Sequence, residues 1–142
     1  MLSRSALEEG TQLCLDFGKL ESVARTGVPV LPVVVQDADT GQVLILAYAN
    51  REALCYTLEH RVAAFWSTSR NELWVKGQTS GDTLDLVEVR VNCEQNSLLY
   101  RVRPRGEGAC HTVDARGRRR KSCYYRRIVD DHLEFINDND EE

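Results

Sequence analysis

Two apolar runs on either side of a turn-forming segment constrain the fold of this chain most strongly. Residues 30–36 are mostly β-branched and apolar, and residues 42–48 are apolar again. Between them, residues 37–41 read DADTG, a composition that favours a tight turn. Pro32 has no backbone N–H, so it suits only an edge strand or the first residues of a strand. The pattern predicts a β-hairpin.

The remaining sequence predicts one α+β domain, β-rich and with mainly antiparallel strands. Asn50 is a good N-cap for a helix over residues 51–60, and apolar residues at helical spacing predict another helix over residues 3–25. Further strands are expected at 62–67, 73–76, 84–92, 98–103 and 124–129, and a loop rich in Gly and Arg at 104–120. We therefore divide the chain into a helical lead-in (1–27), one domain (28–129) and an acidic tail (130–142).

Composition narrows the class of protein. The chain has 142 residues, of which 42% are hydrophobic and 28% charged, as in ordinary one-domain globular proteins. The net charge of -4 argues against a general polyanion binder, although residues 116–121 form a basic cluster. The N-terminal residues lack the apolar run of a signal peptide, so a cytoplasmic location is expected. The cysteine count is five, and an odd number argues against a disulfide framework.

Three of the cysteines lie where they are candidates for metal ligation. Cys93 follows a predicted strand, and Cys110 and Cys123 flank the Gly- and Arg-rich loop. A catalytic zinc takes three protein ligands and leaves one position for water. The spacing contains no CxxC pair, so burial as apolar side chains stays open for these residues. Cys14 and Cys55 fall on predicted helices and are expected in the core.

His111 is the one histidine with a chemically suggestive neighbourhood in the sequence. It stands between Cys110 and Thr112 in a Gly-rich loop, and histidine exchanges protons near neutral pH. His60 lies at the end of a predicted helix, where it suits the helix dipole. His132 lies among acidic residues and is expected to be exposed.

Several motifs together resemble the phosphoribosyl-AMP cyclohydrolase family of histidine biosynthesis. The likeness runs from about residue 28 to residue 126 and begins in VVVQDADTGQVLILAYANREAL. It continues in FWSTSRNELWVKGQTSGD, which is similar to the family's W-S-R-S-R…L-W-x-K-G-E-T-S-G-N. It ends in NCEQNSLL, ACHT and SCYYR, which are similar to D-C-D-x-D-A-L-L, A-C-H-T-G and S-C-F-Y-R.

The resemblance implies an intertwined homodimer with a zinc site at its interface. One subunit supplies Cys93, and the other supplies Cys110 and Cys123. His111 is then expected beside the metal as the catalytic residue. The implied reaction is hydrolytic opening of the purine six-membered ring of phosphoribosyl-AMP at the N1–C6 bond. The implied substrate-binding residues are Arg70, Trp74, Lys76, Gln78, Thr79, Ser80, Gly81 and Asp82.

The chain departs from the family at the segment where three aspartates bind magnesium. The corresponding residues here are Asn92, Glu94 and Asn96, which offer one carboxylate instead of three. Since Mg²⁺ favours carboxylate and phosphate oxygens, we expect this site to be weak or absent. Gln78 and Asp82 also replace a glutamate and an asparagine of the family. The stretch between Cys110 and Cys123 is longer than the family pattern, with the extra residues at about 114–120.

These departures leave other functions open. The chain is expected to be the pathway enzyme itself, or a paralogous zinc hydrolase that acts on a different purine-like nucleotide or cyclic amidine. A non-catalytic module that binds zinc or a nucleotide is a third possibility. Nucleic-acid binding through the basic cluster is disfavoured by the negative net charge, and no membrane partner is expected.

Overall fold

The computed structural model describes residues 2–106 and 108–136, and it contains the predicted hairpin. Strand β1 spans Leu31–Asp37 and pairs antiparallel with β2, Val43–Ala49. Asp37 Oδ1 closes the turn by accepting from the backbone N–H groups of Asp39 at 2.8 Å and Thr40 at 3.2 Å. Gly41 has a φ of 81°, a left-handed conformation that glycine adopts without strain.

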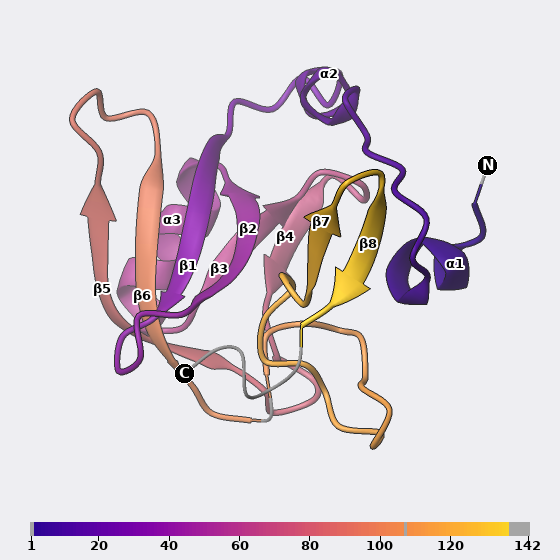
Figure 1. The fold of residues 1–142 in the computed structure, drawn as a ribbon. Helices are drawn as coiled ribbons and strands as arrows, with labels where there is room; N and C mark the ends of the chain where they lie inside the picture. The colour runs from indigo at the N-terminus through magenta and orange to yellow at the C-terminus, as the bar shows by residue number, and fades with distance from the viewer. Residues whose placement is uncertain (1, 107, 137–142) are drawn as a thin grey trace.

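A four-stranded sheet forms the centre of the molecule, with strand order β2-β1-β6-β5 (Figure 1). Strands β5, Leu84–Val91, and β6, Leu98–Pro104, form a second antiparallel hairpin. The two hairpins join through a parallel pairing of β1 with β6, which begins at Val33. Pro32, the second residue of β1, precedes this parallel stretch and is paired with Tyr48 of β2, in keeping with its expected place among the first residues of a strand. The mainly antiparallel, strand-rich single domain is confirmed.

Helix α3, Arg51–His60, covers one face of this sheet (Figure 1). The side chain of Asn50 accepts from Ala53 N at 2.9 Å, so the predicted N-cap is confirmed. The core beneath the helix contains Phe65 and Tyr100, both fully buried, with ring centroids 5.7 Å apart. Thr57 Oγ1 donates to Ala53 O at 2.9 Å and accepts from Ala64 N at 2.9 Å, which satisfies its hydroxyl inside the core.

Two further hairpins complete the fold. Strands β3, Ala64–Ser67, and β4, Glu72–Val75, correspond to predicted strands. Strand β7, Arg126–Val129, pairs with β8, His132–Phe135. Strand β8 has no counterpart among the predicted strands, because its residues lie in the segment that was expected to form an acidic tail. The last part of that segment, residues 137–142, lies outside the described residues.

The prediction of one helix over residues 3–25 is wrong. Two short helices occur instead, α1 at Arg4–Glu9 and α2 at Lys19–Ala24. Gly10 ends α1, and the chain then runs beside β8, where Gln12 forms a bridge with His132. Apolar side chains such as Phe17, which is 93% exposed, find no core to cover. Helical spacing without a partner surface does not hold a helix together.

Two cysteines lie at the surface although the sequence predicted them in the core. Cys14 and Cys55 were expected in the core, but both are exposed, and Cys14 lies between α1 and α2. The reason is that Cys55 occupies the solvent side of α3, and that Val23 is the one buried side chain among the described residues of the lead-in. Among the described residues, no helix has the length and apolar character needed to cross a membrane.

Candidate functional site

A cavity of about 550 Å³ collects most of the residues proposed for substrate binding. Its walls come from β2, from β4 and the turn after it, and from the segment around residues 109–123. Gly81 and Asp82 are not among its lining residues. The predicted residues that line it are Arg70, Trp74, Lys76, Gln78, Thr79 and Ser80, together with His111 and Cys123.

The turn after β4 places Lys76 at the back of this cavity. Gly77 has a φ of 78°, and a Cβ there would collide with the backbone of Asp82, so only glycine fits. Lys76 is 5% exposed, and its Nζ donates to Asp82 O at 3.5 Å. Burial, aided by the Arg119 guanidinium, lowers the pKa of Lys76, while the Asp82 carboxylate opposes the shift. Asp82 thus supports the wall, and it also pairs with Arg119 at 3.5 Å.

Cys110 and Cys123 are held together beside the same cavity. The backbone N–H of Cys123 donates to Leu44 O at 2.7 Å, which fixes it on β2. A hydrogen bond from the Cys123 thiol and one from the Thr112 hydroxyl outweigh burial and lower the pKa of Cys110 to about 5. The same contact, together with desolvation, raises the pKa of Cys123. The contact therefore favours the thiolate form of Cys110, and the thiolate is the form of cysteine that binds metals.

Glu8 is a contact of His111 that the sequence analysis missed. His111 Nε2 lies 2.5 Å from Glu8 Oε2, although 103 residues separate them in the chain. The Glu8 side chain is 22% exposed, and its backbone oxygen accepts from Tyr125 OH at 2.7 Å. Arg126 also donates to Gly10 O at 2.9 Å. These contacts hold α1 against the site, and no motif in the sequence signals them.

Cys93 lies elsewhere in the chain fold. It is exposed in the connection between β5 and β6, across the molecule from the segment that carries Cys110 and Cys123 (Figure 1). Within residues 2–106 and 108–136, no three His, Cys, Asp or Glu side chains are close enough to hold a metal ion. One chain therefore brings two of the three predicted zinc-binding cysteines together.

The predicted magnesium residues are occupied with one another in that same connection. Asn92 Oδ1 accepts from the backbone N–H of Asn96 at 2.9 Å and of Ser97 at 2.9 Å. Asn92 Nδ2 donates to Asn96 Oδ1 at 2.6 Å, and Asn96 Nδ2 donates to Glu94 Oε2 at 3.1 Å. All three side chains stabilise the turn, and amide groups can donate here where carboxylates would repel one another.

The donor groups in and beside the cavity match part of what the zinc implied by the resemblance requires. Zinc prefers thiolate and imidazole ligands, and a thiolate–thiol pair with His111 adjacent in sequence fits that preference. Two thiols satisfy only part of a catalytic site with three protein ligands. The residues present therefore fit zinc as part of its ligand set. The remaining protein ligand would have to come from a second chain or from residues outside the described ones.

Comparisons with known proteins point to one family. A family model described as Phosphoribosyl-AMP cyclohydrolase matches residues 45–125. A phosphoribosyl-AMP cyclohydrolase of Hyphomonas neptunium is 48% identical over 94% of this chain and 91% of its own length. One of Caulobacter vibrioides is 54% identical over 66% of this chain and 63% of its length.

A Thermus thermophilus protein named histidine biosynthesis bifunctional protein HisIE is 50% identical over 71% of this chain. That match spans 44% of the Thermus protein's own length. The family match covers the cavity residues from Arg70 to Ser80, the Cys110–Cys123 pair and His111. The chain belongs to the phosphoribosyl-AMP cyclohydrolase family.

Proposed function

We propose that this protein is a hydrolase that opens the purine ring of phosphoribosyl-AMP at the N1–C6 bond in histidine biosynthesis. One observation carries the proposal: a single cavity is lined by His111, by Cys123 of the Cys110–Cys123 thiol pair, and by cationic and hydroxyl side chains suited to a phosphate. Membership of the family, with relatives of that name about half identical, supports the same activity.

The side chains of the cavity have separable roles in this reaction. Arg70, Lys76, Thr79 and Ser80 supply cationic and hydroxyl donors suited to a nucleotide phosphate. Trp74 is 36% exposed and lines the cavity, so its ring is available to stack on the purine. His111 is positioned to take a proton from the attacking water or to deliver one to N1 as the bond breaks.

We propose that zinc is bound by Cys110 and Cys123 of one subunit and by Cys93 of its partner in an intertwined homodimer. The separation of Cys93 from the thiol pair within one chain supports this arrangement. When bound, zinc supplies Lewis acidity that makes water a stronger acid near neutral pH. Within each chain, the backbone N–H of Cys110 donates to Arg120 O at 3.1 Å and that of Cys123 donates to Leu44 O at 2.7 Å, which fixes the two thiols relative to each other.

Purified protein assayed with phosphoribosyl-AMP tests the proposed activity. Ring opening converts the purine into an imidazole, and ultraviolet absorbance with mass spectrometry of the product reports it. His111→Ala should retain bound zinc and lose turnover by at least about a hundredfold, the lower bound for a lost acid–base group. Rapid hydrolysis of another purine-like nucleotide, with none of phosphoribosyl-AMP, would identify a paralogue. Zinc bound without any hydrolysis would favour a non-catalytic module.

A further inference from the structure

The stretch that separates Cys110 from Cys123 is folded into a tight hairpin. Val113 forms a β-bridge with Arg119. Asp114 Oδ1 accepts from the backbone N–H of Arg116 at 2.9 Å and of Arg118 at 3.0 Å. Gly117, with a φ of 78°, reverses the chain at the tip. The arginine side chains of residues 116–119 therefore project from a fixed base.

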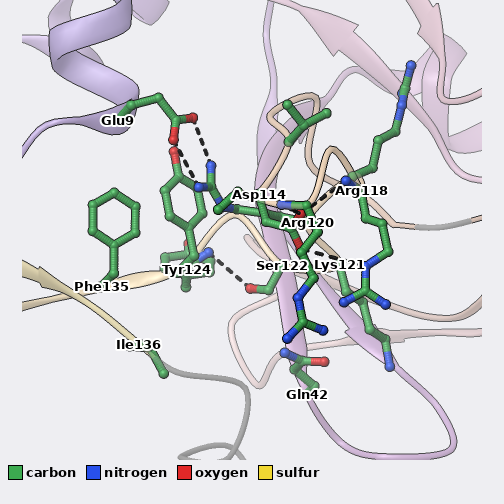
Figure 2. A pocket seen from close by; sticks show the side chains of 15 residues that line it. Glu9, Gln42, Asp114, Arg118, Arg120, Lys121, Ser122, Tyr124, Phe135 and Ile136 are labelled. Atoms are coloured by element: carbon green, nitrogen blue, oxygen red, sulfur yellow. Dashed lines mark hydrogen bonds and ion pairs between the residues drawn. The ribbon is translucent and has the colours of Figure 1, made fainter.

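A second cavity, of about 870 Å³, lies beside this hairpin, and Figure 2 shows the side chains around it. Tyr124, Tyr125 and Phe135 give it an aromatic wall. Glu9 and Asp114 are its acidic lining residues, so three positive charges are in excess. Its cationic lining residues are Arg116, Arg118, Arg119, Arg120 and Lys121.

Two of these cationic side chains, Arg120 and Lys121, already form close ion pairs with carboxylates. Arg120 donates to both carboxylate oxygens of Glu9, at 2.8 and 2.9 Å, as Figure 2 shows. Its guanidinium also lies 4.0 Å from the ring centroid of Tyr125. Lys121 Nζ lies 2.6 Å from the buried carboxylate of Asp37. Their charges are balanced by close partners, so they are poor candidates for holding a ligand.

Arg116 and Arg118 are better placed to hold one. Arg118 reaches Asp114 only at 3.9 Å, and its side chain is 56% exposed. Among residues 2–106 and 108–136, the side chain of Arg116 has no hydrogen-bonding or ion-pairing partner. Guanidinium groups bind phosphate oxygens in a bidentate geometry, so two that line one cavity suit a phosphate monoester.

The second cavity is a neighbour of the candidate active-site cavity, because Arg119 lines both. Phosphoribosyl-AMP carries two phosphate groups, one on the AMP ribose and one on the phosphoribosyl group at N1. The phosphoribosyl group is bonded to the ring atom whose bond to C6 breaks. The hairpin follows Cys110 and precedes Cys123, and His111, Arg119 and Cys123 line the candidate active-site cavity, so the hairpin is anchored beside that cavity.

We propose that the cavity beside the hairpin binds the N1-linked ribose phosphate of the substrate, through Arg116 and Arg118. One substrate molecule then occupies both cavities, with the AMP phosphate among the donors of the turn after β4. This inference rests on the proposed function for the identity of the ligand. The charge and the walls of the cavity are features of the structure and do not depend on that function.

Steady-state kinetics on a double variant, Arg116→Ala with Arg118→Ala, tests this assignment. KM for phosphoribosyl-AMP should rise about tenfold or more while kcat changes less than about twofold, since the reacting groups remain. The matched control, Arg25→Ala with Arg51→Ala, removes the same charge from side chains that do not line the cavity, and it should keep the wild-type KM. A wild-type KM in the hairpin variant, with a wild-type melting curve, overturns the assignment.

Direct binding of ribose 5-phosphate separates this assignment from the proposed function. Calorimetry on the intact protein should show binding that weakens about tenfold in the hairpin variant and is unchanged in the control. If the protein shows this binding pattern but does not hydrolyse phosphoribosyl-AMP, the cavity binds a sugar phosphate and the proposed activity is refuted. If the protein hydrolyses phosphoribosyl-AMP and the hairpin substitutions change neither KM nor binding, the phosphate-binding role of the cavity alone is refuted. Tighter binding of a single-stranded oligonucleotide than of ribose 5-phosphate would replace the ligand with nucleic acid.

Discussion

Neighbouring residues of the ACHT segment have very different environments. Cys110 is 2% exposed and is tied to Thr112 and Cys123. The His111 side chain is 70% exposed and contacts Glu8, a residue near the start of the chain. The thiol is thereby fixed by local contacts, whereas the imidazole depends on the docking of α1.

Glu8→Ala is expected to lower kcat about fivefold with little change in KM, because the imidazole loses the carboxylate that orients it. That factor corresponds to about 1 kcal/mol, the upper range for an exposed ion pair. Glu8→Gln keeps a hydrogen-bond acceptor and should fall between the alanine variant and the wild type. Glu21→Gln on α2, which also removes one exposed carboxylate, is the matched control. Unchanged kcat in Glu8→Ala would show that Glu8 does not position His111.

In the connection between β5 and β6, side chains at the positions of the family's magnesium ligands form hydrogen bonds that stabilise the turn. Its two asparagines use their oxygen and nitrogen atoms to close the turn around Gln95, which has a φ of 57°. Asparagine tolerates such turns well, because its side chain both accepts and donates. The same atoms are then less available to a cation.

The unmodified protein is expected to bind no Mg²⁺ at millimolar concentrations in the absence of substrate, as measured by calorimetry. A dication held by one carboxylate depends on substrate phosphate for its remaining ligands. The triple variant Asn92→Asp, Glu94→Asp and Asn96→Asp should gain measurable Mg²⁺ affinity. Calorimetric Mg²⁺ binding by the unmodified chain would refute this account of the turn. Activity should also survive a chelator concentration that removes Mg²⁺ and spares thiolate-bound zinc.

At the scale of the whole molecule, the fold divides the three candidate zinc ligands between two distant places. In the sheet order β2-β1-β6-β5, Cys123 is bonded to β2 at one edge. Cys93 lies in the turn that connects β5 and β6 at the other edge. Several apolar side chains remain exposed in the single chain, among them Leu46, Val113 and Ile128. Both features agree with a site completed by a second copy.

Mixed dimers provide the test at this scale. Cys93→Ser and Cys110→Ser homodimers should each lack zinc at the shared site and lose activity. Co-expressed with different tags, the two variants form a heterodimer that retains one complete set, with Cys110 and Cys123 from one chain and Cys93 from the other. Its activity should recover to about half of the wild type, because one of two sites is intact. If the purified heterodimer regained neither zinc nor activity, the zinc ligands would have to come from within one chain.

The sequence by itself determined the elements whose signals are local. The hairpin of β1 and β2 follows from two apolar runs and a DADTG turn, and the start of α3 follows from Asn50. The segment proposed to bind substrate is also local, since residues 70–80 lie on the β3–β4 hairpin and the turn after it. Motifs placed the chain in its family, because they record the chemistry of a site in a few adjacent residues.

Only the tertiary structure decided the features that depend on distant partners. The lead-in has helical spacing, yet it breaks at Gly10 because no surface covers its apolar side chains. Strand β8 forms in an acidic segment because β7 and the backbone near Thr11 offer it hydrogen-bond partners. The contact of Glu8 with His111 and the cavity beside the arginine hairpin arise in the same way. Strand pairing and burial depend on which other segments pack against a residue. A local sequence pattern does not specify those segments.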